Sequence, residues 1–204
     1  MKTCSSSLVF ACTVLLTSAI LAAEPPEGFV TLFDGKTLAG WEGNEKMFRV
    51  EDGAIVGGTL KEKIPRNEFL CTTKEYENFE LRLKVKALGE GVNAGIQFRT
   101  KRTANHHEVS GYQADVGAGW WGKLYEEHGR ALLWDKPGDQ HVKPGQWNDY
   151  RIVADGSRIR TYVNGNLCVD LDDPQGTRRG IIAFQIHSGG PLEVRFRKLE
   201  LTVK

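Results

Sequence analysis

The sequence predicts an all-β fold in which two antiparallel sheets pack against each other as a sandwich or jelly roll. Short runs in which apolar and polar residues alternate recur along the chain, as they do in half-buried strands. Turn dipeptides such as Asp-Gly and Asn-Gly separate these runs. No long stretch has the periodicity of an amphipathic helix.

The expected strands follow one another along nearly the whole chain. The clearest is the segment 79–87, in which every second residue is apolar and the residues between are charged. Asp52-Gly53 lies between two such runs and predicts a hairpin turn. We expect strands at residues 29–33, 48–50, 54–56, 69–72, 79–87, 93–99, 111–116, 149–154, 158–163, 167–171, 180–187 and 192–203.

The first 23 residues have the pattern of a secretory signal peptide. Lys2 precedes a mostly apolar run over residues 8–21, and the chain turns polar after Ala23. We expect cleavage after Ala23, a single mature domain of residues 24–204, and a periplasmic or secreted location. The apolar run is short and interrupted for a membrane anchor, so we expect no membrane span in the mature chain.

The charge balance argues against two classes of partner. Removing the signal peptide takes away one lysine and no acidic residue, which leaves basic and acidic residues balanced at 26 each. We therefore expect neither nucleic acid nor an anionic membrane surface as a partner. Cys71 and Cys168 would lie in an oxidising compartment. They could form one disulfide or remain buried free thiols, and the sequence leaves both open.

Three expected strands share a second feature. Each pairs an apolar side with a side that carries a glutamine and an ionisable residue, because successive side chains of a strand point to opposite faces. The polar sides carry Gln97 and Arg99, Gln113 and Asp115, and Gln185 and His187. We predict that these six side chains line one cleft.

A series of motifs, in order, covers nearly the whole mature chain. They include Thr31-Leu32-Phe33-Asp34-Gly35-Lys36, Tyr76-Glu77-Asn78-Phe79-Glu80-Leu81, Asn93-Ala94-Gly95-Ile96-Gln97-Phe98-Arg99, Gly111-Tyr112-Gln113-Ala114-Asp115, Trp121-Gly122-Lys123-Leu124-Tyr125 and Ile182-Ala183-Phe184-Gln185-Ile186-His187. In these motifs the chain resembles the 3-keto-disaccharide hydrolase family. The resemblance implies a concanavalin-like jelly roll that cleaves glycosides already oxidised to a ketone at C3. It also implies an upstream sugar oxidoreductase that makes the keto-sugar.

Such a substrate makes a definite chemical demand. The C3 ketone acidifies the proton on C2, so a base can remove that proton and the enolate can expel the oxygen on C1. Water can then add back, and the net result is hydrolysis. This route needs a base, a group that stabilises the enolate oxygen, and a proton for the leaving group.

The polar residues offer candidates for each catalytic role. His187 is the first choice as base, because histidine exchanges protons near neutral pH. Asp115 could be the base instead, orient His187, or simply pair with Arg99. Arg99 could bind the enolate oxygen. Glu127 could act as an acid, or form a surface ion pair with Arg130.

Other residues are candidates for binding the sugar. The amides of Gln97, Gln113 and Gln185 can both donate and accept hydrogen bonds with hydroxyl groups. Tyr125 and Arg130 could reach in from the segment around Glu127, and Glu80 could lie on the same floor or pair with Arg82 or Lys84. One indole of Trp120-Trp121 could stack on a sugar ring while the other packs inward, and we expect Trp121 to contact substrate.

The sequence establishes no cofactor, and it leaves open a divalent metal ion, which would stabilise an enolate. The available ligand types are His106, His107, His128, Asp115, Glu127 and His187. They have no recognised metal-binding spacing. A non-catalytic, lectin-like carbohydrate-binding module is the alternative to an enzyme, because one scaffold hosts both functions. A catalytically inactive relative that acts as a scaffold is a third reading.

Overall fold

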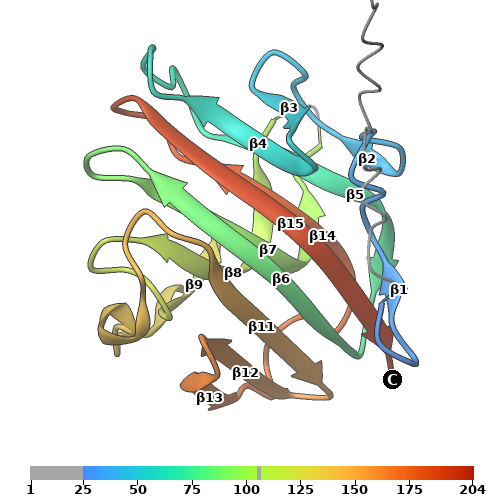
Figure 1. Cartoon of the computed structure of the whole chain (residues 1–204). Coiled ribbons are helices and arrows are strands. Elements are labelled where there is room, and N and C mark those ends of the chain that lie inside the picture. The colour runs from blue at the N-terminus through green and yellow to red at the C-terminus, as the bar shows by residue number, and fades with distance from the viewer. Residues whose placement is uncertain (1–24, 105–106) are drawn as a thin grey trace, which may run out of the picture.

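The computed structural model describes residues 25–104 and 107–204. The predicted signal peptide, residues 1–23, and one candidate metal ligand, His106, lie outside the described residues. The described chain forms two antiparallel sheets packed face to face (Figure 1). Its one helical segment is a single 3₁₀ turn at Asp139–His141. Within the described ranges, no helix is long and apolar enough to cross a membrane.

The eight-stranded sheet contains both termini of the described domain. It consists of β1 (Val30–Thr31), β3 (Phe48–Glu51), β4 (Ala54–Thr59), β6 (Phe79–Leu88), β11 (Asn148–Asp155), β12 (Arg158–Val163), β13 (Asn166–Asp172) and β15 (Leu192–Val203). Its strand order is β13-β12-β11-β6-β15-β4-β3, and β1 pairs with the far end of β15. In Figure 1 the strands β4, β15, β6 and β11 form the layer nearer the viewer.

The seven-stranded sheet forms the second layer. It consists of β2 (Trp41–Glu42), β5 (Glu68–Tyr76), β7 (Asn93–Arg102), β8 (Val109–Gly117), β9 (Leu124–Glu127), β10 (Ala131–Trp134) and β14 (Gly180–Ile186). Its strand order is β10-β9-β8-β7-β14-β5-β2. Because β14 lies between β5 and β7, late and early parts of the chain interleave in the sheet, as they do in jelly rolls.

The core lies between the two sheets and is built from the apolar side of each strand. Phe184 of β14 stacks on Phe196 of β15 with ring centroids 3.9 Å apart, which joins the two layers. Trp41 stacks on the same Phe184 ring at 5.0 Å. Each such buried aromatic contributes roughly 1.5–3 kcal/mol of hydrophobic stabilisation.

The all-β sandwich predicted from the sequence is confirmed. Most expected strands are present, although several are longer than expected, and only Val30–Thr31 of the 29–33 segment is a strand. Three short strands, β2, β9 and β10, were not expected. In β9 two adjacent glutamates interrupt the alternation, and β10 begins at Ala131, whose φ is 65°. Pairing with β8 and with each other, rather than local pattern, makes these segments extended.

Cys71 and Cys168, the two cysteines of the described residues, are free thiols. Cys71 is buried on β5, and burial raises the pKa of its thiol to about 11. Cys168 is half-buried on β13 in the other sheet. Of the two alternatives that the sequence left open, the structure has the free thiols.

Candidate functional site

A pocket of about 190 Å³ opens on the outer face of the seven-stranded sheet. This is smaller than the roughly 300–1,000 Å³ of drug-sized ligand sites, and it suits a small ring. Strands β7, β8, β9 and β14 form its floor, and the loop after β8 supplies an aromatic wall. It is lined by Asn93, Gln113, Asp115, Trp120, Tyr125, Glu127, Gln185 and His187.

A chain of amides fixes the floor of the pocket. Gln97 donates from Nε2 to Oε1 of Gln113, so Gln113 must present its own amide N–H groups on the other side. Gln113 then donates from Nε2 to Oδ1 of Asp115 at 2.7 Å. Gly95 leaves room for this arrangement, because a Cβ there would lie 2.4 Å from Cδ of Gln113. Gln97 is fully buried beneath the pocket and orients a residue that lines it, so the prediction that Gln97 itself lines the cleft is wrong.

Asp115 is the most perturbed acid in the pocket. Only 3% of its surface is exposed, and its Oδ2 is buried with no hydrogen-bond partner in residues 25–104 and 107–204. Burial raises the pKa of Asp115 to about 7, and the charge of Glu127 adds to the rise, whereas Gln113 and Lys123 oppose it. A carboxyl group with this pKa exists in both protonation states at neutral pH, which suits acid or base catalysis.

Glu127 is a second carboxyl group with a raised pKa. Burial is the main cause, the nearby Glu108 adds to the rise, and His128 and His187 oppose it. Gln185 donates from Nε2 to Oε2 of Glu127 at 3.3 Å. Oε1 of Gln185 is buried and has no partner among the described residues. A ligand hydroxyl that donates to this oxygen would satisfy it.

The environment of His187 determines which nitrogen can accept a proton. Nδ1 lies 2.7 Å from the carbonyl oxygen of Ser188. A carbonyl can only accept, so Nδ1 carries the hydrogen. In the neutral ring the lone pair is therefore on Nε2, and the ring lines the pocket. This is the tautomer that a general base needs if Nε2 faces the substrate.

The two tryptophans of the Gly-Trp-Trp-Gly loop have opposite orientations, and the prediction that Trp121 contacts substrate is wrong. Trp121 is 5% exposed and stacks on Tyr150 in the core at 6.2 Å. Trp120 is 39% exposed and lines the pocket. Lys123 lies over its ring, with Nζ 4.8 Å from the centroid. The pair divides as expected, with the roles exchanged.

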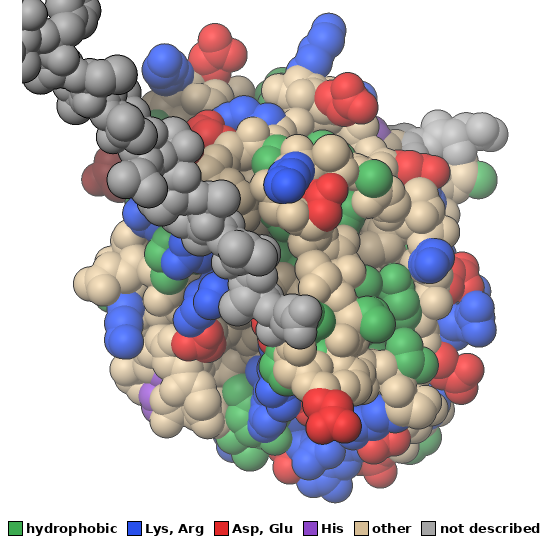
Figure 2. Space-filling view, turned by 45° about the vertical axis from the view of Figure 1, so that its right-hand side comes forward, with side chains coloured by type: hydrophobic (Ala, Val, Ile, Leu, Met, Phe, Trp, Pro, Cys, Tyr) green, Lys and Arg blue, Asp and Glu red, His purple; other side chains and the backbone are tan. Residues whose placement is uncertain are grey.

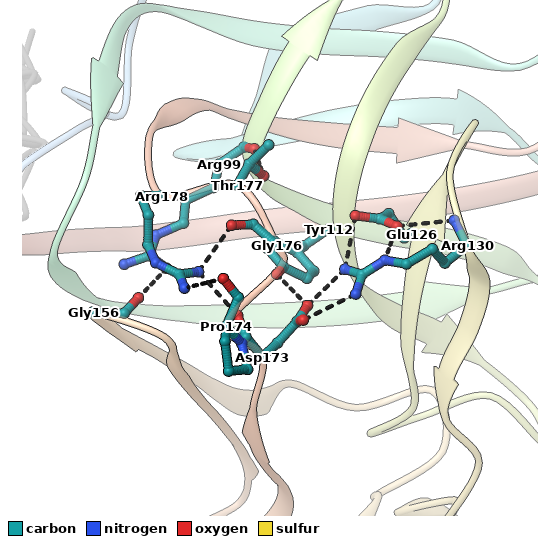
Figure 3. A network of polar contacts seen from close by, with 10 residues as sticks. All are labelled: Arg99, Tyr112, Glu126, Arg130, Gly156, Asp173, Pro174, Gly176, Thr177 and Arg178. Carbon is teal, nitrogen blue, oxygen red and sulfur yellow. Dashed lines mark hydrogen bonds and ion pairs between the residues drawn. The ribbon is translucent and has the colours of Figure 1, made fainter.

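The prediction that Arg99 faces the cleft is also wrong. A bulge in β7 between Phe98 and Lys101 breaks the alternation, and Arg99 has a φ of 48°. Its side chain is fully buried at one end of the sandwich (Figure 3). It donates to the carbonyl oxygens of Glu77 at 2.8 Å and Gly156 at 2.7 Å and to Oδ1 of Asn78 at 3.0 Å. Arg99 thus ties together turns at the ends of strands and does not line the pocket.

Arg130 likewise lies away from the pocket. Its guanidinium forms ion pairs with Glu126, with Nε 2.6 Å from Oε2, and with Asp173, with Nη2 2.6 Å from Oδ2. The hydroxyl of Tyr112 donates to the same Asp173 carboxylate at 2.5 Å (Figure 3). Because Glu126 and Glu127 are adjacent on a strand, their side chains point to opposite faces. Arg130 pairs with Glu126 and therefore lies on the side away from Glu127 and the pocket. The predicted role of Arg130 as a substrate clamp is not supported.

Glu80 lies in the other sheet. It is on the outer face of β6, where it accepts from Nε of Arg82 at 2.7 Å. Arg151 is a second cation nearby, at 3.7 Å. The prediction that Glu80 lies on the pocket floor is therefore wrong, and the alternative of a pair with Arg82 is what the structure has.

The remaining predicted site residues converge. Gln113, Asp115, Gln185, His187, Tyr125 and Glu127 line the pocket. Asn93 was missed as a lining residue, although it has the same parity along β7 as Gln97. The alternation of side chains along this strand could therefore have identified Asn93. Glu108, whose charge acts on Glu127, gave no signal in the sequence because it lies in the loop before β8.

One group of side chains has the geometry to hold a divalent ion. The ligand atoms of Glu108, Glu127 and His128 lie within 4.8 Å of one another. Two carboxylates and an imidazole are a suitable donor set for zinc or manganese. Asp115 and His187, which were also candidate ligands, are not members of this group. An ion held there would lie beside the pocket through Glu127.

One protein family matches nearly the whole of the described domain. The model of the 3-keto-alpha-glucoside-1,2-lyase-like domain family matches residues 28–202, so the protein is a member of that family. Among curated proteins, none matches the sequence closely enough to be a relative.

Two solved structures have the same fold over most of this chain. A candidate glycosyl hydrolase from Parabacteroides distasonis is 20% identical, with a TM-score of 0.67 over 87% of this chain and 94% of its own. The carbohydrate-binding module CBM66 from Bacillus subtilis is 15% identical, with a TM-score of 0.59 over 78% of this chain and 93% of its own. At these identities the likeness establishes a common fold, and the jelly-roll prediction is confirmed.

Proposed function

We propose that this protein cleaves the glycosidic bond of 3-keto-glycosides by removing the C2 proton and eliminating the C1 oxygen. Membership of the 3-keto-alpha-glucoside-1,2-lyase-like family supports the substrate class. The single observation that carries the mechanism is the pairing, in one small pocket, of a histidine with a free Nε2 lone pair and a buried carboxyl with a pKa near 7. One group can accept a proton and the other can donate one, as the reaction requires.

The proposed steps assign each proton. His187 takes the C2 proton on Nε2, and the electron pair moves into the enolate of the C3 ketone. Collapse of the enolate breaks the C1–O bond, and Asp115 in its acid form donates a proton to the departing oxygen. The product is an enone with a C1–C2 double bond. Addition of water at C1 and return of a proton to C2 complete a net hydrolysis.

In this proposal neutral hydrogen-bond donors stabilise the enolate, since Arg99 lies outside the pocket. The amide of Asn93 and the hydroxyl of Tyr125 line the same pocket and can donate to the ketone oxygen. Glu127, whose pKa is also raised, adds a donor whenever it is protonated. Preorganised donors of this kind contribute roughly 3–4 kcal/mol each in characterised oxyanion sites.

Deuterium exchange separates the two halves of the reaction. The pure protein is incubated in D₂O with 3-keto-glucosides that carry either a sugar or a nitrophenyl leaving group. Deuterium should appear at C2 of the released 3-keto-glucose. His187→Gln should abolish both exchange and cleavage. Asp115→Asn should impair cleavage of the disaccharide far more than that of the nitrophenyl glycoside, because nitrophenolate leaves without a proton.

The matched control is Asp52→Asn, which changes an exposed carboxylate in the β3–β4 turn. Its exchange and cleavage should match the unmodified protein. Cleavage without deuterium at C2 would refute the elimination route. Full activity of His187→Gln would refute the assignment of the base.

A second function has one observation in its favour. A carbohydrate-binding module shares the fold, and Trp120 offers an exposed aromatic wall of the kind that stacks on sugar rings. A lectin-like protein, or an inactive relative serving as a scaffold, would bind the keto-sugar without cleaving it. The same incubation decides between them, since calorimetry would show binding while the substrate stays intact.

The proposal extends to where and with what the protein works. The apolar leader at residues 1–23 supports export to the periplasm or the medium. A 3-keto-glycoside must be made by oxidation of a sugar hydroxyl, so a sugar oxidoreductase is the expected upstream partner.

A further inference from the structure

A second hollow lies on the outer face of the other sheet. It has a volume of about 580 Å³, larger than the pocket that holds His187, and it falls in the range of ligand sites. Strands β15, β6, β11 and β12 form it. They are neighbours in the eight-stranded sheet, and Figure 1 shows β15, β6 and β11 side by side in the nearer layer.

The strand register aligns charged side chains across this hollow. Glu200 pairs with Arg82, Arg82 with Arg151, and Arg151 with Tyr162 across four adjacent strands. A parallel row runs from Arg197 through Lys84 to Asp149. Side chains opposite each other on one face of an antiparallel sheet lie close enough to act together.

The lining is positively charged within a chain that is nearly neutral. Its cations are Arg82, Lys84, Arg151 and Lys198, and its acids are Asp149 and Glu200. Two of the cations have close partners, since Arg82 pairs with Glu80 at 2.7 Å and Lys84 with Asp149 at 2.5 Å. The other two cations, Arg151 and Lys198, are offset only by Glu200 in the lining and by Glu80, which lies 3.7 Å from Arg151 and already pairs with Arg82.

Arg151 and Lys198 present unused donors. The guanidinium of Arg151 stacks on the Tyr162 ring, with Cζ 3.8 Å from the centroid. Its nearest acid is Glu80 at 3.7 Å, too far for a hydrogen bond. Lys198 is exposed in a bulge of β15 with a φ of 53°, and its amine has no partner in the described part of the chain. Lysine adopts this backbone conformation at a cost of about 1–2 kcal/mol.

Two further arginines on the same face have unsatisfied donors. The Nε atoms of Arg160 and Arg197 are buried, and neither has a hydrogen-bond partner among the described residues. Arg197 also stacks on Trp147, with Cζ 4.0 Å from the centroid. Neither arginine lines the hollow itself, but both lie on the same outer face of the sheet, and buried donors without acceptors are uncommon in proteins.

We propose that this hollow binds an anionic oligosaccharide, whose charge comes from uronate carboxylates or sulfate esters. Planar guanidiniums suit both anions, because each can take two parallel hydrogen bonds. The hydroxyl group of Tyr162, which also lines the hollow, can donate to or accept from a sugar hydroxyl. The choice of a sugar over another anion rests on the proposed function, and the hollow would hold a charged polysaccharide while the opposite face acts on its substrate.

Calorimetry with defined oligomers tests the proposal on the mature chain. The probes are galacturonate oligomers, sulfated galactose oligomers, neutral galactose oligomers and single-stranded DNA of similar length. The test variant is Arg151→Gln with Lys198→Gln, which keeps most of each side chain and removes both charges. The matched control is Lys61→Gln with Lys63→Gln, which removes two exposed charges outside the hollow.

The expected result is binding of at least one anionic oligomer, with the double variant weakened about tenfold because two ion pairs are lost. Comparison of the galacturonate oligomers with the sulfated galactose oligomers shows whether the site binds carboxylates or sulfate esters. Neutral oligomers and DNA should bind far more weakly, and the control should match the unmodified protein. Thermal melts of both variants should be unchanged, which excludes misfolding as the cause.

Three outcomes would overturn the proposal: no binding of either anionic oligomer, equal binding by the double variant, or equal binding of DNA. Cleavage of a neutral 3-keto-glucoside should be the same in the double variant, since the two sites lie on opposite sheets. If the protein cleaves the keto-glucoside but binds no anionic oligomer, only the binding proposal is refuted. If it binds the oligomers but does not cleave the keto-glucoside, only the enzymatic proposal is refuted.

Discussion

Replacing Asp115 with asparagine should make the protein more stable at alkaline pH. Asparagine has the same shape, and its Oδ1 can still accept the hydrogen bond from Gln113. It cannot ionise. In the unmodified protein the carboxyl is buried, and the cost of charging it there is the main reason that its pKa is about 7 instead of the ordinary 3.8. The substitution therefore removes the cost of a buried charge.

The size of the effect follows from the two pKa values. A raised pKa in the folded state means that stability is fully present below pH 3.8 and is lost as the pH rises through about 7. Since a tenfold change in proton affinity is about 1.4 kcal/mol, the whole loss is about 4 kcal/mol. About 3 kcal/mol of this falls between pH 5 and pH 8.5. Asp115→Asn should not show this loss of stability between pH 5 and pH 8.5.

Denaturant unfolding followed by tryptophan fluorescence measures this difference. The stability of Asp115→Asn relative to the unmodified protein is compared at pH 5 and at pH 8.5, so that all other titrating groups cancel. Asp52→Asn is the control, because its side chain is 85% exposed. A stability difference that is the same at both pH values would show that Asp115 is already ionised at pH 5, and the account of its burial would be wrong.

Three further outcomes are expected. Trp120→Ala should raise KM for a keto-glycoside about tenfold and leave the melting temperature unchanged, because only a stacking surface is lost. Trp121→Ala should instead lower the free energy of unfolding by about 3–5 kcal/mol. Steady-state kinetics and thermal melts of both variants would show whether the two roles are reversed. Arg99→Met should lower the free energy of unfolding by roughly 2–5 kcal/mol, because buried carbonyls lose their donors, while kcat per folded molecule stays the same; a selective fall in kcat would return Arg99 to the reaction. Intact-mass analysis of the exported protein should give a chain that begins at Glu24, and a retained leader would contradict the predicted cleavage.

The sequence by itself determined the fold class and which side of each strand is polar. Alternation along a strand depends only on local geometry, so Gln113 and Asp115, and likewise Gln185 and His187, were correctly assigned to one side. The hairpin at Asp52-Gly53 was equally local, since both residues adopt the positive φ angles that such turns need.

Only the tertiary structure decided which sheet each polar side belongs to. A sandwich has two outer faces, and alternation cannot distinguish them, so Glu80 was placed in a pocket that lies on the opposite sheet. The bulge that turns Arg99 away depends on how β7 pairs with β8 and β14. The choice between Trp120 and Trp121 depends on the core beneath the loop, and the pKa of Asp115 depends on burial. Each of these is set by neighbours distant in sequence, which is why local pattern could not reveal them.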